Sequence, residues 1–192
     1  METVRLKEIA EIKFCTITPS RSKPFEASSK WLLCANFLNN NEIDLKFTIN
    51  NVLPDKDWLL SENDIVIKRI TPTFVNYIDY IQPGIYCGNN LIIVTPNDKV
   101  DAKYLAMILN ERIVDLSKES SIGAVMKSIS RTDLEKMQIP LLDLQTQKTI
   151  GLIWYNGIEL KKKKSKLAEL ENKKINYEIK KAIKILGGNS NG

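Results

Sequence analysis

The sequence predicts an α+β protein: a globular domain with a mixed, irregular β-sheet and short helices, followed by one long C-terminal helix of the coiled-coil type. Residues 1–150 alternate short apolar, β-rich runs with turn signals, whereas the remainder is rich in Lys, Glu, Leu and Ile and lacks proline. Hydrophobic residues make up 43% and charged residues 27% of the 192 residues, which indicates a folded chain. We therefore expect a domain over residues 1–143, a helix over residues 144–186 and a disordered tail over residues 187–192.

The elements of the domain follow from local patterns. Short apolar runs predict strands at residues 31–37, 64–70 and 91–94, and residues 6–12 predict a short helix. Asp101 is a helix N-cap candidate, because good helix formers follow it with apolar residues at positions 104, 105, 108 and 109. Residues 132–137 predict a short helical turn, which leads into an extended exit at residues 138–142.

The long helix carries an apolar stripe with spacings of three and four residues and an imperfect heptad pattern. At 1.5 Å per residue it would extend on the order of 60 Å, so its stripe requires a partner helix. The predicted dimer and subunit interface consists of Ile150, Ile153, Trp154, Leu160, Leu167, Leu170, Ile175, Ile179 and Leu186. The four lysines at residues 161–164 point around the whole helix, which favours a solvated surface over a DNA-binding patch.

The positive charge is concentrated in the C-terminal part. The net charge is +5, but the chain from Gly151 onward holds ten lysines and four glutamates, which leaves 18 basic and 19 acidic residues in residues 1–150. Nucleic-acid contacts of the domain must therefore come from local clusters of cations.

Several function classes are disfavoured by composition. The chain contains no histidine, which removes the commonest general base and zinc ligand. Cys15, Cys34 and Cys87 are odd in number and widely spaced, and we expect buried reduced thiols rather than a metal site. The absence of a signal-peptide run and of a membrane-length apolar stretch predicts a cytoplasmic protein without membrane contact.

Four segments, in the same order, resemble the specificity subunits of type I restriction-modification systems. Residues 139–150, Ile-Pro-Leu-Leu-Asp-Leu-Gln-Thr-Gln-Lys-Thr-Ile, resemble the segment that leaves the target recognition domain and starts the conserved helix, with Gln147 and Ile150 in register. Residues 123–130, led by glycine and followed by Asp133-Leu134, are similar to the loop before that segment. Residues 62–68 resemble a strand of the family, and residues 6–12, with Thr18-Pro19 after them, resemble its opening.

The resemblance implies a DNA-recognition subunit without catalytic residues, metal or cofactor of its own. Its partners would be double-stranded DNA, methyltransferase (modification) subunits that methylate adenine with S-adenosylmethionine, and restriction subunits that use ATP and Mg²⁺. Full-length members carry two recognition domains and two conserved helices that pair antiparallel, whereas this sequence holds one of each. We therefore expect a half-subunit that dimerises through residues 144–186 and reads one half-site per domain; a fragment or an engineered half stays an alternative.

DNA reading requires cations for phosphates and amides or arginines for base edges. Two local cation clusters fit, one after the strand at residues 64–70 and one after Gly123, together with an Asn pair. The predicted DNA-binding residues are Lys68, Arg69, Thr71, Asn89, Asn90, Lys127, Ser128, Ser130 and Arg131. Asn is also an ordinary turn residue, which is the favoured interpretation of residues 39–41 and of the pair at 89–90.

Three rival functions stay open. Asp55, Asp101 and Lys103 superficially resemble the carboxylate and lysine set of a metal-dependent nuclease, but Asp101 fits an N-cap better. A non-enzymatic coiled-coil scaffold would dimerise without binding DNA in a salt-dependent, sequence-preferring way. An anti-restriction derivative of the same family would bind the methyltransferase without supporting modification.

Overall fold

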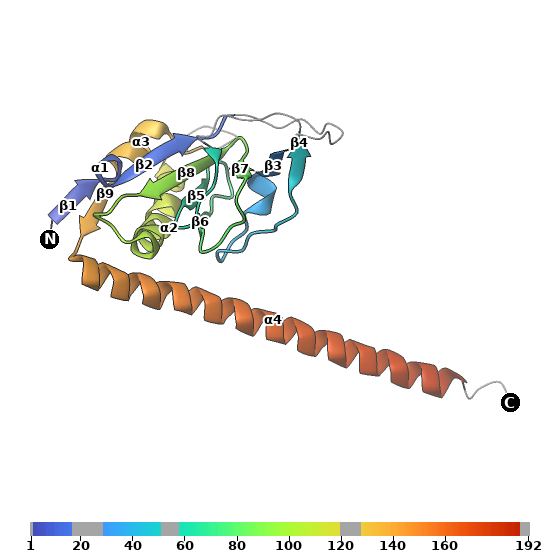
Figure 1. Cartoon of the computed structure of the whole chain (residues 1–192). Coiled ribbons are helices and arrows are strands. Elements are labelled where there is room, and N and C mark those ends of the chain that lie inside the picture. The colour runs from blue at the N-terminus through green and yellow to red at the C-terminus, as the bar shows by residue number, and fades with distance from the viewer. Residues whose placement is uncertain (1, 17–28, 51–57, 120–127, 189–192) are drawn as a thin grey trace. The chain divides into compact units, whose positions relative to one another are not determined.

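The computed structural model describes residues 2–16, 29–50, 58–119 and 128–188 (Figure 1). The elements in chain order are β1 (Glu2–Arg5), α1 (Leu6–Ile9), β2 (Ala10–Phe14), β3 (Ser29–Leu32), the 3-10 turn η1 (Cys34–Asn36), β4 (Thr48–Asn50), β5 (Ile65–Lys68), β6 (Val75–Tyr77), β7 (Ile85–Cys87), β8 (Leu91–Pro96), α2 (Ala102–Glu119), α3 (Arg131–Lys136), β9 (Gln138–Leu141) and α4 (Leu144–Gly188). The chain divides into two compact units, Met1–Tyr155 and Asn156–Gly192.

A four-stranded antiparallel sheet in the order β2-β8-β5-β6 forms the centre of the first unit. Its two middle strands are buried on both faces, which explains why their sequences are continuous apolar runs rather than alternating ones. Ile65, Ile67 and Ile92 lie in one hydrophobic cluster, while Val66 and Ile93 lie in the other. The first cluster also receives α1, α2 and α3, and the second receives β3, η1 and β7.

Two smaller sheets complete the domain. β3 pairs with β4 antiparallel and with β7 parallel, so the sheets of the domain are mixed as predicted. β1 pairs antiparallel with β9, and the two strands lie side by side in Figure 1. This pairing places residues from the start of the chain next to the segment that leads into α4.

Both long helices begin at an aspartate cap, of which only the one at Asp101 was predicted. Asp101 Oδ1 accepts a hydrogen bond from Tyr104 N at 2.9 Å, which caps α2. Asp143 Oδ1 accepts one from Thr146 N at 2.9 Å and caps α4. Thr146 Oγ1 also donates to Asp143 Oδ2 at 2.6 Å, and this side-chain hydrogen bond, together with the backbone one, lowers the pKa of Asp143 below its ordinary value. The N-cap prediction for Asp101 is therefore confirmed.

The structure corrects several predicted boundaries. The helix predicted at residues 6–12 is a single turn, because the chain enters β2 at Ala10. The strand predicted at residues 31–37 ends at Leu32 and gives way to η1. β8 extends to Pro96, and α4 continues to Gly188, beyond its predicted end at residue 186.

The cysteine prediction is only partly correct. Cys15 and Cys87 are buried, whereas Cys34 is half-buried, and all three are free thiols. Trp31 is fully buried in the core.

Candidate nucleic-acid interface

The first predicted cation cluster follows the end of β5. Lys68 ends the strand, and its backbone N–H donates to Phe74 O at 2.9 Å. The Lys68 ammonium lies 5.5 Å from the centroid of the Phe74 ring. The backbone N–H of Arg69 donates to Asn90 O at 2.9 Å. The turn before β8 therefore fixes the backbone position of Lys68 and Arg69 at the end of β5.

The second predicted cluster lies directly beside the first. Ile70 and Ser128 form an antiparallel bridge. Ile129 N donates to Arg69 O at 3.2 Å, and Arg69 Nε donates back to Ile129 O at 3.0 Å. Two clusters that are far apart in sequence therefore share one edge of the domain.

Phe14, at the end of β2, joins the arginines of these two clusters. The Cζ atom of Arg69 lies 5.6 Å from the centroid of the Phe14 ring, and that of Arg131 lies 4.4 Å from it. Both distances fall within the roughly 6 Å range at which a guanidinium is attracted to an aromatic face. Phe14 was not among the predicted site residues, because an apolar residue at a strand end carries no signal of its own.

The predicted Asn pair lies at the same edge but has a role in the turn. Asn90 has a φ of 61°, and its carbonyl accepts from Arg69 N and from Cys34 Sγ, the latter at 3.3 Å. Asn89 O accepts from the same thiol at 3.5 Å. Burial raises the pKa of the Cys34 thiol, although the nearby Lys68 opposes this, so the protonated thiol is available as the donor.

The hydroxyl groups of the predicted set differ in their environments. Ser130 Oγ accepts from Asp133 N at 3.1 Å and donates to Asp133 Oδ2 at 2.6 Å, which makes it the N-cap of α3. Ser128 and Thr71 are exposed. Lys127 lies outside the described residues, as do Gly123 and Thr18-Pro19.

The start of α4 is locked onto the domain by a buried glutamine. Gln147 is fully buried, and its Oε1 accepts from Asp101 N at 2.9 Å. Its Nε2 donates to Leu142 O at 2.8 Å and to Lys99 O at 3.4 Å. One side chain therefore satisfies three backbone groups, which gives a physical reason for the glutamine in the helix-starting segment.

Close packing between helices strengthens this attachment. A Cβ at Gly151 would lie 2.5 Å from Tyr104 N, so α4 approaches the backbone of α2 more closely than any side chain allows. The Lys103 ammonium lies 4.9 Å from the Tyr77 ring and 5.0 Å from the Tyr155 ring. These contacts tie α2 and β6 to the third turn of α4.

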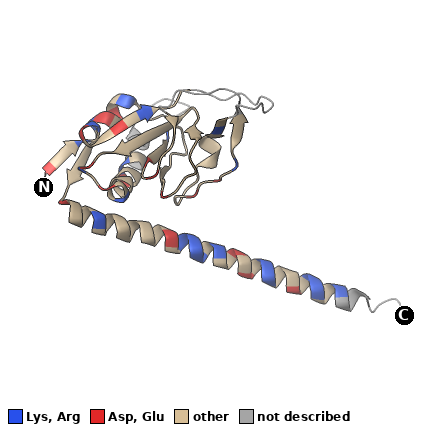
Figure 2. Cartoon of the chain, in the orientation of Figure 1, with Lys and Arg blue, Asp and Glu red and all other residues tan. Residues whose placement is uncertain are grey.

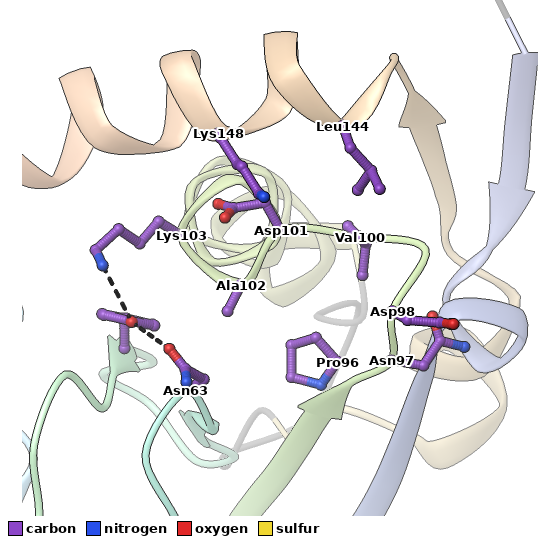
Figure 3. A pocket seen from close by; sticks show the side chains of 11 residues that line it. Asn63, Pro96, Asn97, Asp98, Val100, Asp101, Ala102, Lys103, Leu144 and Lys148 are labelled. Atoms are coloured by element: carbon purple, nitrogen blue, oxygen red, sulfur yellow. Dashed lines mark hydrogen bonds between the residues drawn. The ribbon is translucent and has the colours of Figure 1, made fainter.

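A cavity of about 340 Å³ opens where the starts of α2 and α4 meet (Figure 3). Two of the charged groups that line it have protein partners: Lys103 Nζ donates to Tyr77 Oη at 3.3 Å and pairs with Asp79 at 3.7 Å, while Asp101 caps α2. Burial acts to lower the pKa of Lys103, but the Tyr77 hydrogen bond and the nearby carboxylates outweigh it and raise the pKa.

The nuclease alternative requires Asp101 and Lys103 to face a metal. The Asp101 carboxylate instead serves a helix cap and the Lys103 ammonium lies against two tyrosine rings. Across the ranges that the structure describes, no three or more His, Cys, Asp or Glu residues gather in a way that could hold a metal ion. Asp55 lies outside those ranges.

A protein-family model, that of the type I restriction modification DNA specificity domain, matches residues 1–181 of the sequence. The chain belongs to this family. The predicted family is therefore confirmed. None of the curated proteins that were compared with this specificity domain matches its sequence.

Solved structures share the fold of this specificity domain. An HsdS subunit from Thermoanaerobacter tengcongensis matches with a TM-score of 0.64 and 22% identity, over 87% of this chain and 39% of that one. A type I restriction-modification S subunit from M. genitalium matches with a TM-score of 0.61 and 14% identity, over 90% and 42%. A chain from a structure of the type I R-M system, described in terms of complex assembly and conformational transition, matches with a TM-score of 0.60 and 18% identity. The match covers 95% of this chain and 44% of that one. The specificity domain thus spans about two fifths of the length of these chains.

The predicted interface residues of α4 fall into two groups. Ile150 and Trp154 are partly buried against the hydrophobic core of their own domain. Ile153, Leu160, Leu167, Leu170, Ile175 and Ile179 are exposed, each by more than half of its surface. The side chain of Leu186 lies outside the described residues. No described helix of the specificity domain is long and apolar enough to cross a membrane.

Proposed function

We propose that this chain is the DNA-reading subunit of a type I restriction-modification complex and performs no chemistry itself. The observation that carries the proposal is the meeting of Lys68, Arg69 and Arg131 at one edge of a domain of the specificity family. Cations grouped in this way suit the phosphates of a duplex, and the neighbouring loops would read base edges. Partner subunits would supply S-adenosylmethionine-dependent methylation of adenine and ATP- and Mg²⁺-dependent restriction.

The charge distribution predicts weak DNA binding by the chain alone. Residues 1–150 hold 18 basic and 19 acidic residues, so the domain has no overall positive field. Figure 2 shows both signs along α4, with Lys in excess. A few phosphate contacts give salt-sensitive binding that needs the methyltransferase to clamp the duplex. Nanomolar binding of one site by the purified chain at physiological salt would contradict this proposal.

The exposed stripe of α4 supports a homodimer of two such chains. Within residues 156–184, Leu160, Leu167, Ile175 and Ile179 recur on one face, and each is at least 51% exposed. Side chains of this size are stabilised by burial, and a second copy offers the same stripe. A two-fold dimer would read a palindromic, split DNA target.

Two charged residues interrupt this stripe and favour an antiparallel arrangement. Lys164 lies between Leu160 and Leu167 at spacings of four and three, and Glu171 follows Leu167 by four. In a parallel dimer in register, each would face its own copy, and like charges would repel. In an antiparallel dimer centred beside Leu167, Lys164 meets Glu171 of the second copy, and Leu160 meets Ile175.

Charge reversal tests this dimer. Lys164→Glu or Glu171→Lys alone should weaken the dimer about 5- to 100-fold, because two symmetric pairs become repulsive, and the double variant should restore it. Analytical ultracentrifugation measures the dissociation constant. Single variants that dimerise like the unaltered chain would exclude the antiparallel pairing, and an unaltered chain that stays monomeric at high concentration would exclude the homodimer.

Mapping of methylated adenines tests the function itself. The gene of the partner methyltransferase subunit is expressed in a methylation-free bacterial host with the unaltered chain, with an Arg69→Gln/Arg131→Gln variant, or without the chain. A bipartite methylation motif that requires the unaltered chain supports the proposal, and a palindromic motif supports the dimer. No new methylation with a folded methyltransferase present favours the scaffold or anti-restriction function.

A further inference from the structure

Phe14 occupies a point where three segments of the domain meet. β2 pairs with β8 so that Phe14 lies opposite Ile92, and the ring packs partly against the first hydrophobic cluster. Its backbone is therefore held by the central sheet and its ring by the core. The remaining ring surface faces two guanidinium groups, those of Arg69 and Arg131.

The two guanidiniums lie within 10.0 Å of each other, because both contact the same ring. Their distances to the ring centroid add up to 10.0 Å, which is the upper limit for the separation of the two Cζ atoms. Arg131 Nη1 forms an ion pair with Glu135 Oε1 at 3.3 Å, and the Nε–H of Arg69 donates to Ile129 O. A guanidinium has five N–H donors, so donors remain on both side chains for an anion with several oxygen atoms.

A shared ring reduces the freedom that the arginines would lose on binding. A free arginine side chain carries substantial rotamer entropy, and binding a ligand normally requires losing it. Attraction to one fixed aromatic ring limits both side chains before the ligand arrives. Phosphate suits two adjacent guanidiniums because its oxygens accept several charge-assisted hydrogen bonds at once.

We infer that Phe14 is a positioning residue that holds Arg69 and Arg131 as a clamp for the phosphates of the DNA backbone. The inference rests on the proposed function, since DNA is the source of the phosphate. The clamp contributes affinity independently of sequence, and base reading belongs to other parts of the domain.

The test compares leucine and tyrosine at position 14 of the full chain. The probe is a labelled duplex of about 30 base pairs of mixed sequence, followed by fluorescence anisotropy from about 50 to 200 mM salt. Phe14→Leu should weaken binding about 3- to 30-fold and reduce the salt slope by about 1, whereas Phe14→Tyr keeps the aromatic face and should bind like the unaltered chain. Phe47→Leu is the matched control, because its ring lies 5.8 Å from Nζ of Lys30, a residue of β3, which is not in the sheet of Phe14.

A double-variant cycle separates positioning from a general loss of structure. Phe14→Leu should have no further effect in an Arg69→Gln/Arg131→Gln background, because the side chains that it positions are then uncharged. An equal effect in both backgrounds overturns the inference. Circular dichroism checks folding, and if Phe14→Leu does not fold, Phe14→Met takes its place under the same criteria.

Failure of the inference and failure of the proposed function give different results. If the arginine pair variant binds weakly but Phe14→Leu binds like the unaltered chain, Phe14 does not position the clamp and the proposed function stands. If the unaltered chain shows no salt-dependent binding at about 50 mM salt, both are overturned.

Discussion

Replacing Gly151 by alanine tests the closest approach in the attachment of α4. A Cβ at this position would lie 2.5 Å from Tyr104 N, 2.7 Å from Asp101 Oδ1 and 3.0 Å from the Lys103 carbonyl carbon. Two of these atoms belong to backbone at the start of α2, which has little freedom to move. The third is the carboxylate oxygen that caps α2, so the substitution also disturbs the cap.

The expected effect is a net loss of stability despite the better helix propensity of alanine. Alanine is favoured over glycine in a helix interior by ~1 kcal/mol. Overpacking costs about 1–3 kcal/mol and a disturbed N-cap about 1 kcal/mol more. The free energy of unfolding should therefore fall by about 1–3 kcal/mol, which corresponds to a decrease in Tm of roughly 2 to 12 °C for a chain of this size.

Gly157→Ala provides the matched control on the same helix. Apart from the helix's own backbone and the adjacent residues, no atom of the described residues lies within 4 Å of a Cβ at that position, so the substitution should leave stability unchanged or raise it by up to ~1 kcal/mol. Urea unfolding followed by the fluorescence of the buried Trp31 measures both variants. If Gly151→Ala proves as stable as Gly157→Ala, the close approach of α4 to α2 is refuted.

Three further substitutions test the attachment, the core and the interface. Gln147→Leu leaves Asp101 N and two carbonyl groups without their partner and should lower the unfolding free energy, measured with urea, by about 1–3 kcal/mol or more. Gln145 is exposed, and Gln145→Leu as the control should change the unfolding free energy by less than about 0.5 kcal/mol. Burial raises the pKa of Asp64 above its ordinary value of 3.8. Between pH 3.8 and the raised pKa, the folded state therefore keeps a proton that the unfolded state releases. The contribution of Asp64 to the unfolding free energy falls as the pH rises through this window. The unfolding free energy of the unaltered chain minus that of Asp64→Asn should decline across this window, and a constant difference would contradict the shift. Ser130→Ala removes the α3 cap and should lower the unfolding free energy by about 1 kcal/mol. Ser130→Asp keeps the cap but adds a negative charge beside Arg131, which should weaken DNA binding. Equal DNA binding by the two variants would show that Ser130 is not part of the interface.

Long periodic segments and caps could be predicted from the sequence, but short elements could not. α2 was predicted from its Asp101 cap and apolar spacing, and α4 from apolar spacings that repeat over many residues. Residues 6–12 were misassigned because four helical residues and five strand residues share one apolar run. At that length tertiary pairing decides the conformation, here the pairing of β2 with β8.

The components of the site could be predicted, but not how they combine. Adjacent cations at Lys68-Arg69 and near Arg131 were visible as local clusters. Their contact depends on hydrogen bonds between Arg69 and Ile129, which arise from the fold and leave no trace in local sequence. The role of Gln147 was available only through family resemblance, because a buried glutamine inside a helix looks like any polar residue until its three backbone partners are known.

Two truncations test whether recognition and dimerisation reside in separable parts of the chain. Both hydrophobic clusters consist of residues up to Tyr155, and the first compact unit ends there. A chain ending at Tyr155 keeps Gln147, Gly151 and the Tyr155 contact with Lys103, so it should fold, bind mixed-sequence DNA weakly and remain monomeric.

A chain that ends at Asp143 has the predicted domain boundary but lacks all of those contacts. It leaves Asp101 N unpaired and exposes core surface that Ile150 and Trp154 partly cover, and it should therefore unfold at a distinctly lower urea concentration. Equal stability of the two truncated chains would mean that the first turns of α4 are not part of the domain. In contrast, a dimer formed by the chain ending at Tyr155 would place the interface on the domain rather than on the exposed stripe of α4, since Leu160, Leu167, Ile175 and Ile179 are all absent from it.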